Sequence, residues 1–352
     1  MTIIHLTSTL GGGGAEQMVL QLAKKSNTTY KTLVISLSSK LTTLEKRFKK
    51  NNIKYHLIGV NSFKNSSLTK GLIKFKGITN KETNIVIHCH MYHAILFGII
   101  YKLQYPQTRL IFTLHSNKLE LRSRRLILFF SKSLRYKDII FSNSGKKWYL
   151  KSNYEIIPNG VDFNYFNTKQ KTNFPNKFTF LFIGRISHEK SPLRLVKAAQ
   201  QLLEQGITNF VINFVGDGVL KDELIKCIYE KKIENYFNLY GFQQDIRPYL
   251  SDANCLLLPS LWEGLPVVII EAAASQLPII STPVGSIPDF LNFNNSYLSE
   301  LETFDKTMLH VMENYDEALY KAELLYKEIK STFDIKNVYK EHLKLYKLSL
   351  LQ

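Results

Sequence analysis

The segment SLWEGLPVVIIE, residues 260–271, decides the fold of this chain. It follows an apolar run at 255–258, which the pattern predicts as a buried strand, and it opens a helix with Pro266 near the first helical position. Backbone N–H groups at the start of a helix lack intrahelical partners, so such a turn can hold a phosphate. Glu263 lies in the turn, and Glu271 follows about two helical turns later. Two carboxylates beside an anion-binding turn suit a ligand with a diphosphate and sugar hydroxyls; the simpler interpretation is a helix cap at Glu263 and a solvated Glu271.

The same design recurs in the C-terminal half of the chain. In FLFIGRISHEKSP, residues 180–192, an apolar strand breaks at Gly184 and places Arg185 and Lys190 before the next helix. Special residues therefore follow the carboxyl ends of strands, which is where open α/β sheets bind ligands. The other segments of this design are NFVGDGVLKDEL at 213–224 and FNLYGFQQDIRPYL at 237–250.

These segments occur in a recognisable order from about residue 3 to residue 290. The first half contributes GGGGAE at 11–16, FTLH at 112–115, SNS at 142–144 and IIPNGVDFNYF at 156–166. The second half contributes GRISHEK, VGDG, GFQQD, EGLPVVIIE and PIISTPVGSIPDF. Single pieces are weak signals, but the ordered set resembles the retaining nucleotide-sugar glycosyltransferases of family 4, which have the GT-B fold.

The resemblance implies an α/β chain with two Rossmann-like α/β/α domains facing across a cleft. We expect an acceptor-binding domain at 1–166, a donor-binding domain at 167–334 and a terminal helix at 335–352 that packs back on the first domain. The polar stretch NTKQKTNFPN at 167–176 is the best linker candidate. Alternating strand and helix patterns independently predict parallel sheets covered by helices. The expected strands are 2–6, 32–37, 55–58, 85–88, 110–114, 139–142, 179–183, 211–215, 238–240, 255–258 and 278–281.

Composition agrees with a large enzyme. At 352 residues the chain exceeds the size at which one hydrophobic core stops growing, so two domains are expected. Cys89, Cys227 and Cys255 are odd in number and far apart, which favours a reducing compartment over a disulfide framework. The N-terminus lacks a basic leader, and no apolar run reaches the length of a membrane span. We therefore expect a cytoplasmic protein that can associate peripherally with the inner face of the cytoplasmic membrane.

Positive charge is concentrated in the first half. Residues 1–166 hold 26 Lys and Arg against 7 Asp and Glu, whereas residues 167–352 hold 20 against 22. Such asymmetry indicates an anionic partner, namely a membrane lipid, a phosphorylated acceptor or nucleic acid, unless the lysines form only a solvated face. Residues 118–137 are basic around LILFF, which is typical of a peripheral membrane contact. The candidate contacts are Arg122, Arg124, Arg125, Lys132 and Arg135.

The donor phosphates have two candidate cations. Arg185 and Lys190 can stabilise the negative charge that a diphosphate leaving group gains, and they can also be ordinary surface charges. The chain has no Asp-x-Asp pair to hold a phosphate-bound Mg²⁺ or Mn²⁺, so we expect no metal and no other cofactor. The four glycines at 11–14 do not fit the dinucleotide fingerprint G-x-G-x-x-G. By resemblance, that loop approaches the donor diphosphate from across the cleft.

The remaining donor contacts are assigned partly from the residues and partly from the resemblance. Glu271 would accept hydrogen bonds from ribose hydroxyls, and Glu263 would bind sugar hydroxyls. The loop at 242–245 is the candidate site for the base, and its simpler interpretation is a plain loop. The expected donor-binding residues are Gly13, Gly14, Gly184, Gly216, Phe242, Asp245, Gly264, Leu265, Pro266 and Glu271.

Histidines cluster in the first half. HCHMYH, residues 88–93, can be interpreted as a metal site, but no carboxylate or second cysteine lies nearby in sequence. We expect instead that His90 and His93 line the acceptor side and that His88 is structural. His115 matches the family's histidine near the donor sugar, so the catalytic candidates are Arg185, Lys190, Glu263 and His115.

The resulting hypothesis is a metal-independent, retaining transferase. It would move a hexose or N-acetylhexosamine from a nucleotide diphosphate sugar, a UDP-sugar rather than a GDP-sugar by preference, to a lipid-linked glycan in bacterial surface polysaccharide biosynthesis. One alternative is a nucleotide-sugar 2-epimerase of the same fold, which the scarcity of acids in the first half disfavours. The other is a nucleic-acid-binding protein, which would leave the paired carboxylates of 260–271 without a purpose. We therefore expect no nucleic-acid partner.

Overall fold

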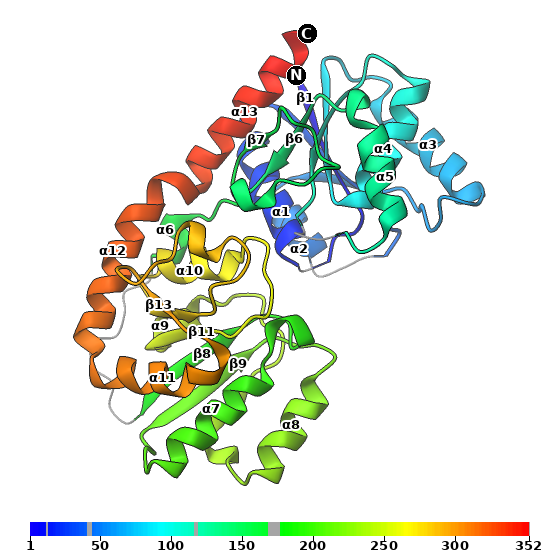
Figure 1. Cartoon of the computed structure of the whole chain (residues 1–352). Helices are drawn as coiled ribbons and strands as arrows, with labels where there is room; N and C mark the ends of the chain where they lie inside the picture. The colour runs from blue at the N-terminus through cyan, green and yellow to red at the C-terminus, as the bar shows by residue number, and fades with distance from the viewer. Residues whose placement is uncertain (12, 41–43, 116–118, 168–176, 352) are drawn as a thin grey trace. The chain divides into compact units, whose positions relative to one another are not determined.

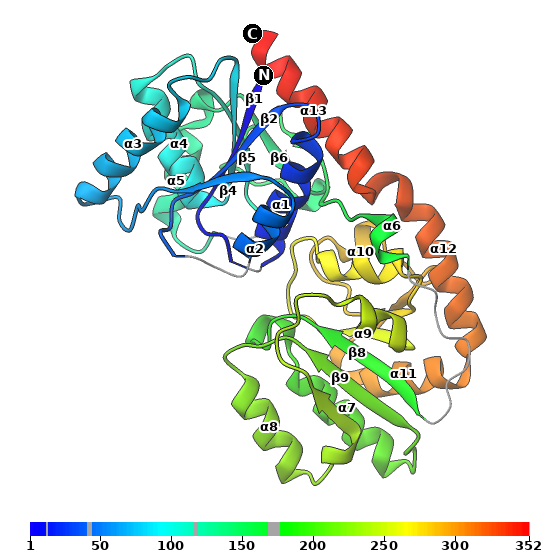
Figure 2. The ribbon, with the colours of Figure 1, turned by 180° about the vertical axis from the view of Figure 1, so that it is seen from behind.

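The computed structural model describes residues 1–11, 13–40, 44–115, 119–167 and 177–351. Contacts divide the chain into unit 1, Met1–Gly160 with Ile335–Gln352, and unit 2, Val161–Asp334. Figures 1 and 2 show that each unit has its own sheet with helices on both faces. The segment 335–352, expected to return to the first domain, is grouped with unit 1, and 161–166 is grouped with unit 2. Residues 168–176 of the expected linker lie outside the described residues.

Unit 1 is built on a seven-stranded parallel sheet of order β3-β2-β1-β4-β5-β6-β7. Its strands are β1 (Thr2–Thr7), β2 (Lys31–Ser36), β3 (Lys54–Leu57), β4 (Ile85–His90), β5 (Arg109–Thr113), β6 (Lys137–Ile140) and β7 (Glu155–Ile156). Its α-helices are α1 (Gly14–Ser26), α2 (Leu44–Lys50), α3 (Ser66–Thr79), α4 (Tyr92–Gln104), α5 (Arg122–Phe130) and α13 (Ile335–Leu351). Short 3₁₀ turns follow at η1 (Lys132–Leu134) and η2 (Asn143–Gly145).

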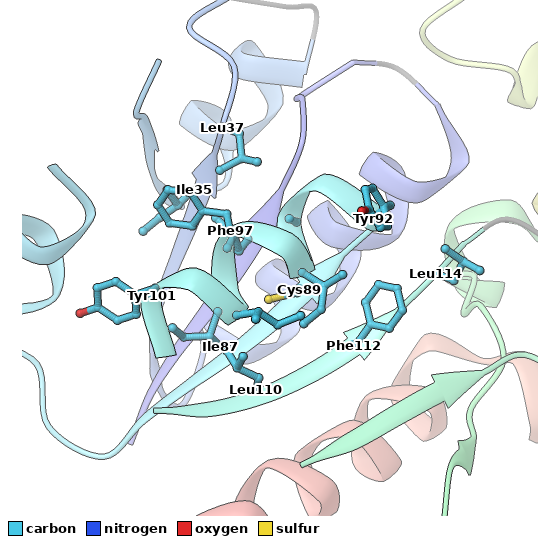
Figure 3. Packing of buried hydrophobic residues seen from close by; sticks show 14 of the residues in the cluster. Ile35, Leu37, Ile87, Cys89, Tyr92, Phe97, Tyr101, Leu110, Phe112 and Leu114 are labelled. Carbon is cyan, nitrogen blue, oxygen red and sulfur yellow. The ribbon is translucent and has the colours of Figure 1, made fainter. Parts of the chain in front are cut away.

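Strand alternation gives this sheet two different cores, because successive side chains point to opposite faces. On one face Ile87 and Cys89 of β4 pack with Leu110 and Phe112 of β5 and with Phe97 of α4 (Figure 3). On the other face Ile3, Val86 and Ile111 pack against side chains of α1 and α13, including Met18, Leu22, Val338 and Tyr346. The alternate positions His5, His88 and His90 therefore also point towards the second face.

Unit 2 is built on a six-stranded sheet of order β10-β9-β8-β11-β12-β13, again with all pairings parallel. Its strands are β8 (Phe178–Ile183), β9 (Phe210–Val215), β10 (Phe237–Leu239), β11 (Cys255–Leu258), β12 (Ile279–Ser281) and β13 (Tyr297–Leu298). Its α-helices are α6 (Phe163–Phe166), α7 (Leu193–Glu204), α8 (Lys221–Glu230), α9 (Arg247–Asp252), α10 (Val267–Ala274), α11 (Phe304–Glu313) and α12 (Tyr315–Phe333). Its 3₁₀ turns are η3 (His188–Lys190), η4 (Glu234–Tyr236), η5 (Ile287–Asp289) and η6 (Leu301–Thr303).

The strands expected from the sequence are confirmed, with ends that differ by at most two residues. Buried runs such as 255–258 are recognisable because both faces of a parallel sheet are covered, so nearly every side chain in them is apolar. β7 and β13 were not predicted. Each has two residues, which is too short for any periodicity to be visible.

Candidate functional site

The centre of the unit 2 sheet contains a change of direction. From β8 the chain builds outwards through β9 and β10, then returns to place β11 on the other side of β8. Adjacent loops after β8 and β11 therefore leave the sheet on opposite sides, and the crevice between them is where open α/β sheets bind ligands. These loops are the segments 184–192 and 259–266, which the sequence singled out.

An ion pair joins the two loops. Lys190 Nζ lies 2.5 Å from Glu263 Oε1, and Ser260 Oγ donates to the same oxygen at 2.6 Å. The backbone N–H of Leu261 donates to the carbonyl of Glu189 at 2.8 Å. The side chains of Lys190 and Glu263 are 18% and 8% exposed, so the pair is largely shielded but open on one side. Two residues predicted for separate roles are thus in direct contact.

Arg185 is the second cation at this edge. Its side chain is 69% exposed, and Nη1 lies 3.8 Å from Glu189 Oε1. An exposed pair at that distance contributes little to stability, since solvent screens it. The guanidinium is therefore held near the loop without being committed to a strong partner.

Glycine allows the β8 and β9 loops to approach closely. Gly216 has φ +146°, and a Cβ there would lie 1.8 Å from the carbonyl oxygen of Gly184. A Cβ on Gly218 would lie 2.3 Å from the carbonyl oxygen of Ile186. A Cβ on Gly184 would lie 3.7 Å or more from its neighbours, which is ordinary van der Waals contact. Gly216 is therefore required by packing, whereas Gly184 leaves its surface open.

The turn before α10 is held by the segment after β12. The Gly264 carbonyl accepts hydrogen bonds from the backbone N–H and the hydroxyl of Ser286. Thr282 Oγ1 donates to the Ser260 carbonyl at 2.6 Å. Leu265 is buried, and α10 begins directly after Pro266, the N-cap. Side-chain hydrogen bonds therefore fix the N-terminus of α10 beside Glu263, and Glu271 lies on that helix.

Sequence reasoning missed Ser260, Thr282 and Ser286 as supports of this turn. Ser260 was visible as a hydroxyl three residues before Glu263, a spacing that brings side chains together in a tight turn. Thr282 and Ser286 follow a different strand, so no local signal connects them with 260–264.

The loop proposed for the base is shaped by a stacked arginine. Phe242 is 52% exposed. The Asp245 carboxylate accepts two hydrogen bonds from the Arg247 guanidinium, Nε to Oδ1 at 2.9 Å and Nη2 to Oδ2 at 2.5 Å, and a third from the Arg247 backbone N–H at 3.1 Å. The Arg247 guanidinium lies 3.9 Å from the centroid of the Tyr165 ring. Asp245 therefore orients Arg247, while the ring of Phe242 is accessible.

The glycine-rich turn of unit 1 includes an acidic side chain. Gly13 is the N-cap of α1 and Gly14 its first residue, while Gly12 lies outside the described residues. Glu16 accepts a hydrogen bond from Thr9 Oγ1 at 2.7 Å, and a Cβ on Gly13 would lie 2.9 Å from Glu16 Oε2. The lack of a side chain at Gly13 thus makes room for Glu16.

Histidines form a chain at the carboxyl edge of the unit 1 sheet. His5 Nδ1 lies 3.1 Å from His90 Nε2, and His90 Nδ1 lies 2.9 Å from His115 Nε2. His88 is bonded separately, at 2.8 Å to both the Tyr346 hydroxyl and Thr113 Oγ1. The prediction that His88 is structural agrees with these contacts. His115 has φ +54°, so its backbone is in the left-handed region as it leaves β5.

Burial keeps these rings neutral. It lowers the pKa of His5 to about 3, with a smaller contribution from His342. The same causes lower the pKa of His115 to about 3, and burial lowers that of His342 to about 4. A ring that resists protonation can accept and donate one hydrogen bond each, which suits a fixed chain of imidazoles.

One expectation about the histidines needs correction. His90 is fully buried and bonds to His5 and His115, so its side chain does not line an acceptor surface. His93 lies on α4, with its ring stacked near Phe63 at 6.1 Å between centroids, and its place on the acceptor side stays a prediction. The imidazoles of His5, His88 and His90 do place nitrogens within 4.8 Å of one another.

The chemistry of that trio fits a metal ion poorly. Both nitrogens of His88 already have hydrogen-bond partners, and His5 shares a hydrogen bond with His90. No carboxylate within the described ranges belongs to the group, so a buried divalent charge would have no anionic ligand.

The basic stretch of unit 1 forms a mixed surface on α5. Phe130 is 77% exposed and Trp148 51% exposed, while Leu128 is the one buried residue of LILFF. Arg122 and the alkyl and aromatic side chains of this face are accessible, and Lys132 Nζ donates to the Trp148 carbonyl at 2.7 Å. No helix among the described residues is long and apolar enough to cross a membrane.

Arg135 was wrongly expected on this surface. Its side chain is buried, and its guanidinium donates from Nε and Nη2 to the two oxygens of Asp138 at 2.7 and 2.8 Å. It also donates to the Leu128 carbonyl at 2.7 Å. Arg135 therefore ties η1 to β6 inside the unit. Lys118, the first basic residue of the stretch 118–137, lies outside the described residues.

Comparison with known proteins places these features in context. Residues 164–309, which include the paired loops of unit 2, match the family model glycosyl transferases group 1. An uncharacterised glycosyltransferase of Methanocaldococcus jannaschii is 31% identical over 216 residues, and the match covers 55% of this chain and 53% of that protein. This chain thus spans about half the length of that relative.

A second relative is matched over a longer stretch. The UDP-Gal:alpha-D-GlcNAc-diphosphoundecaprenol alpha-1,3-galactosyltransferase of Escherichia coli is 29% identical over 262 residues, covering 67% of each chain. Among solved structures, Anabaena HepE in complex with UDP-glucose has a TM-score of 0.86 and 17% identity, and the match covers 99% of both chains. This likeness confirms the expected fold, GT-B with two Rossmann-like domains.

Proposed function

We propose that this protein is a retaining, metal-independent glycosyltransferase of family 4. It would transfer a hexose or N-acetylhexosamine from a nucleotide diphosphate sugar to a glycan acceptor. The observation that carries the proposal is the contact between the loops after β8 and β11, where Lys190 meets Glu263 beside the N-terminus of α10. A cation, a helix N-terminus and a carboxylate together match a diphosphate joined to a sugar.

The diphosphate would be held without a metal ion. Lys190 and Arg185 supply two positive charges, and the first N–H groups of α10 supply hydrogen-bond donors. When the diphosphate approaches, Lys190 would exchange part of its contact with Glu263 for a phosphate oxygen. Glu263 would then be available to accept hydrogen bonds from the sugar. The ion pair thus keeps both groups in position before the donor binds.

The reaction would proceed on one face of the sugar. The bond between the anomeric carbon and the phosphate oxygen breaks, and the acceptor hydroxyl forms the new glycosidic bond from the same side. The donor phosphate takes the hydroxyl proton, so no protein carboxylate is required as a base. Lys190 and Arg185 would stabilise the negative charge that develops on the diphosphate, an effect that typically lowers a barrier by about 3 kcal/mol.

A UDP-sugar is the preferred donor, and a GDP-sugar is the second choice. The E. coli relative is named for a UDP-sugar donor and a diphosphoundecaprenol acceptor. By extension, the acceptor of this chain would be a lipid-linked glycan used for a bacterial surface polysaccharide. Such a substrate lies at the membrane surface, which requires the enzyme to work there.

The α5 surface provides a basis for that location. Phe130 and Trp148 expose aromatic rings, Lys132 bonds to the Trp148 carbonyl, and Arg122 is exposed at the start of α5. Aromatic rings insert at the headgroup level, and each basic residue near an anionic surface contributes about 1 kcal/mol. We therefore propose a peripheral contact between this face and the inner leaflet of the cytoplasmic membrane.

The function is tested with a panel of UDP-, GDP- and ADP-sugars. The full chain is incubated with each donor in the presence of EDTA, and slow hydrolysis is followed by release of the nucleotide. We expect one class of donor, the UDP-sugars, to be hydrolysed. If the protein instead isomerises the sugar while the donor stays intact, the epimerase alternative replaces this proposal. If no donor is turned over and binding to RNA falls steeply with salt, the basic half serves nucleic acid.

A further inference from the structure

Unit 1 has a basic cavity that the proposed reaction does not use. It measures about 390 Å³, which is within the usual range of small-molecule sites. Arg109 and Lys137, the first residues of β5 and β6, lie on its wall, so the cavity opens at the amino edge of the sheet. The other lining residues are Lys102, Ser133, Arg135, Tyr136, Lys151 and Asn153.

This cavity is separate from the histidine chain in the same unit. His115 follows the carboxyl end of β5, whereas Arg109 begins that strand. At a rise of about 3.3 Å per residue the two positions are about 20 Å apart. A ligand in the basic cavity would therefore lie far from the histidine chain.

Acidic side chains neutralise only part of the charge in the cavity. Asp138 is engaged by Arg135, and Glu155 pairs with Lys137 at 2.9 Å. The ammonium of Lys102 donates to the Thr108 carbonyl at 2.9 Å, and that of Lys151 donates to the Arg135 carbonyl at 2.7 Å. A carbonyl satisfies a hydrogen bond but does not cancel a full charge. Lys102, Arg109 and Lys151 thus leave an excess of positive charge around a shared space.

Without a bound anion, the protonated forms of two lysines in the cavity are disfavoured. The pKa of Lys102 is lowered by burial and then by the nearby charges of Arg109 and Lys151. Burial also lowers the pKa of Lys151, where the repulsion of Arg135 and Lys137 opposes the attraction of Asp138. An anion placed between these groups would relieve the repulsion. This clustering of positive charge therefore favours an anion-binding site over a charge network that stabilises the fold.

We propose that this cavity binds a phosphate group, either a phosphate monoester or a diphosphate. A carboxylate would leave most of the excess charge in place, whereas a phosphate monoester carries about −1.5 to −2 at neutral pH. Arg109 offers a planar fork of donors suited to phosphate oxygens, and the hydroxyl of Ser133 and the amide of Asn153 offer neutral donors.

The phosphate could come from a soluble ligand or from a lipid headgroup. Lys151 Nζ also approaches the Lys132 carbonyl at 3.2 Å, and Lys132 in turn bonds to Trp148 of the exposed aromatic surface. The wall of the cavity is therefore continuous with the face that we propose lies on the membrane. The cavity itself does not depend on the glycosyltransferase proposal, because none of its residues belongs to the donor site.

Hydrogen exchange followed by mass spectrometry tests the proposal on the full chain. Two probes are used at constant ionic strength: pyrophosphate, and phosphatidylcholine vesicles with or without phosphatidic acid. We expect slower exchange in residues 102–109, 133–137 and 151–153, by about tenfold when the probe exceeds its Kd tenfold. The readout is local, so pyrophosphate bound at the donor loops of unit 2 is seen separately.

The variant Lys102→Met with Arg109→Gln should lose this protection. The exposed pair Lys70→Met with Lys74→Gln on α3 removes equal charge and should keep it. Arg109→Gln alone is the second variant, with unchanged thermal unfolding as the check that it folds. Protection by pyrophosphate, with or without protection by acidic vesicles, assigns a soluble phosphate, and protection by acidic vesicles alone assigns a lipid headgroup. Three results would overturn the proposal. The first is that neither probe protects these residues, and the second is that chloride at the same ionic strength protects them equally. The third is that the variant with both Lys102 and Arg109 replaced keeps the protection.

Discussion

In unit 2 the carboxyl edge of the sheet carries charged side chains, whereas in unit 1 the same edge carries neutral imidazoles. Lys190 and Glu263 form an ion pair between two loops, and their side chains are 18% and 8% exposed. His5 and His90 are fully buried, and burial lowers their pKa so that they stay uncharged. Charged side chains that can exchange partners suit the binding of an anionic donor, whereas neutral imidazoles fixed by hydrogen bonds suit a rigid part of the structure.

The largest expected effect concerns the charged edge. Lys190→Ala should lower turnover by two to three orders of magnitude, because a cation aimed at developing charge typically contributes about 3 to 4 kcal/mol to the transition state. Arg185→Ala should act in the same direction. Steady-state kinetics with the best donor of the panel measures both. Lys197→Ala, an exposed lysine on α7, serves as the control and should leave kcat unchanged. Turnover near that of the control in Lys190→Ala would remove Lys190 from the mechanism.

The second effect concerns the exposed basic surface. Replacing Arg122, Arg124 and Lys132 by Gln should weaken partitioning onto anionic vesicles by about a hundredfold, at about 1 kcal/mol per residue. Sedimentation with vesicles at low and high salt measures it, and donor hydrolysis in solution should be unchanged. Replacing Lys70, Lys74 and Lys81, which are exposed elsewhere in unit 1, is the matched control. Equal loss in both triple variants would mean that net charge, rather than this face, drives the binding.

The third effect concerns the close approach of two loops in unit 2. Gly216→Ala should destabilise the protein by about 2 kcal/mol or more, because its Cβ would overlap the Gly184 carbonyl and its φ is unfavourable for a side chain. Gly206→Ala isolates the second cause, since Gly206 has φ +80° but no atom within 4 Å of a built Cβ. Chemical denaturation compares the two. If they are equally destabilised, the contact with Gly184 is not required.

Lowering the pH should first destabilise the carboxyl edge of the unit 1 sheet, where the neutral histidines lie. The folded-state pKa of His5 and of His115 is about 3, below the unfolded value of about 6.5. The unfolded chain therefore binds more protons between these values, and the stability that neutral rings provide above pH 6.5 is lost as pH falls towards 3. Hydrogen exchange at decreasing pH should show β1, β4 and β5 losing protection, and His5→Leu should reduce the slope. A pH-independent profile for these strands would contradict the assignment.

The fold could be predicted largely because its signals are local. Apolar runs such as 179–183 and 211–215 define buried strands, and Gly184 and Gly216 mark their ends. The two-residue strands β7 and β13 escaped, because pairing with a neighbour rather than sequence pattern creates them.

The candidate site could be predicted only as separate parts. Lys190 and Glu263 were both recognised, but their contact spans two loops that the order of strands brings together. Arg135 shows the opposite error, because its local context is basic and apolar while its partner Asp138 becomes relevant only when η1 packs on β6. His5 and His342 escaped because they come from β1 and α13, far from the HCHMYH segment. The shared face of His88 and His90 was visible, since alternate positions of a strand point to the same side.

The central claim is that the charged edge of unit 2 binds the nucleotide diphosphate without a metal ion. Hydrogen exchange on the full chain with saturating UDP and EDTA tests it most directly. We predict slower exchange in residues 184–191, 216–220 and 260–271, and we predict that Lys190→Ala needs much more UDP to reach the same protection. Unchanged exchange in these loops, or protection that appears only when Mg²⁺ or Mn²⁺ replaces EDTA, would contradict the account.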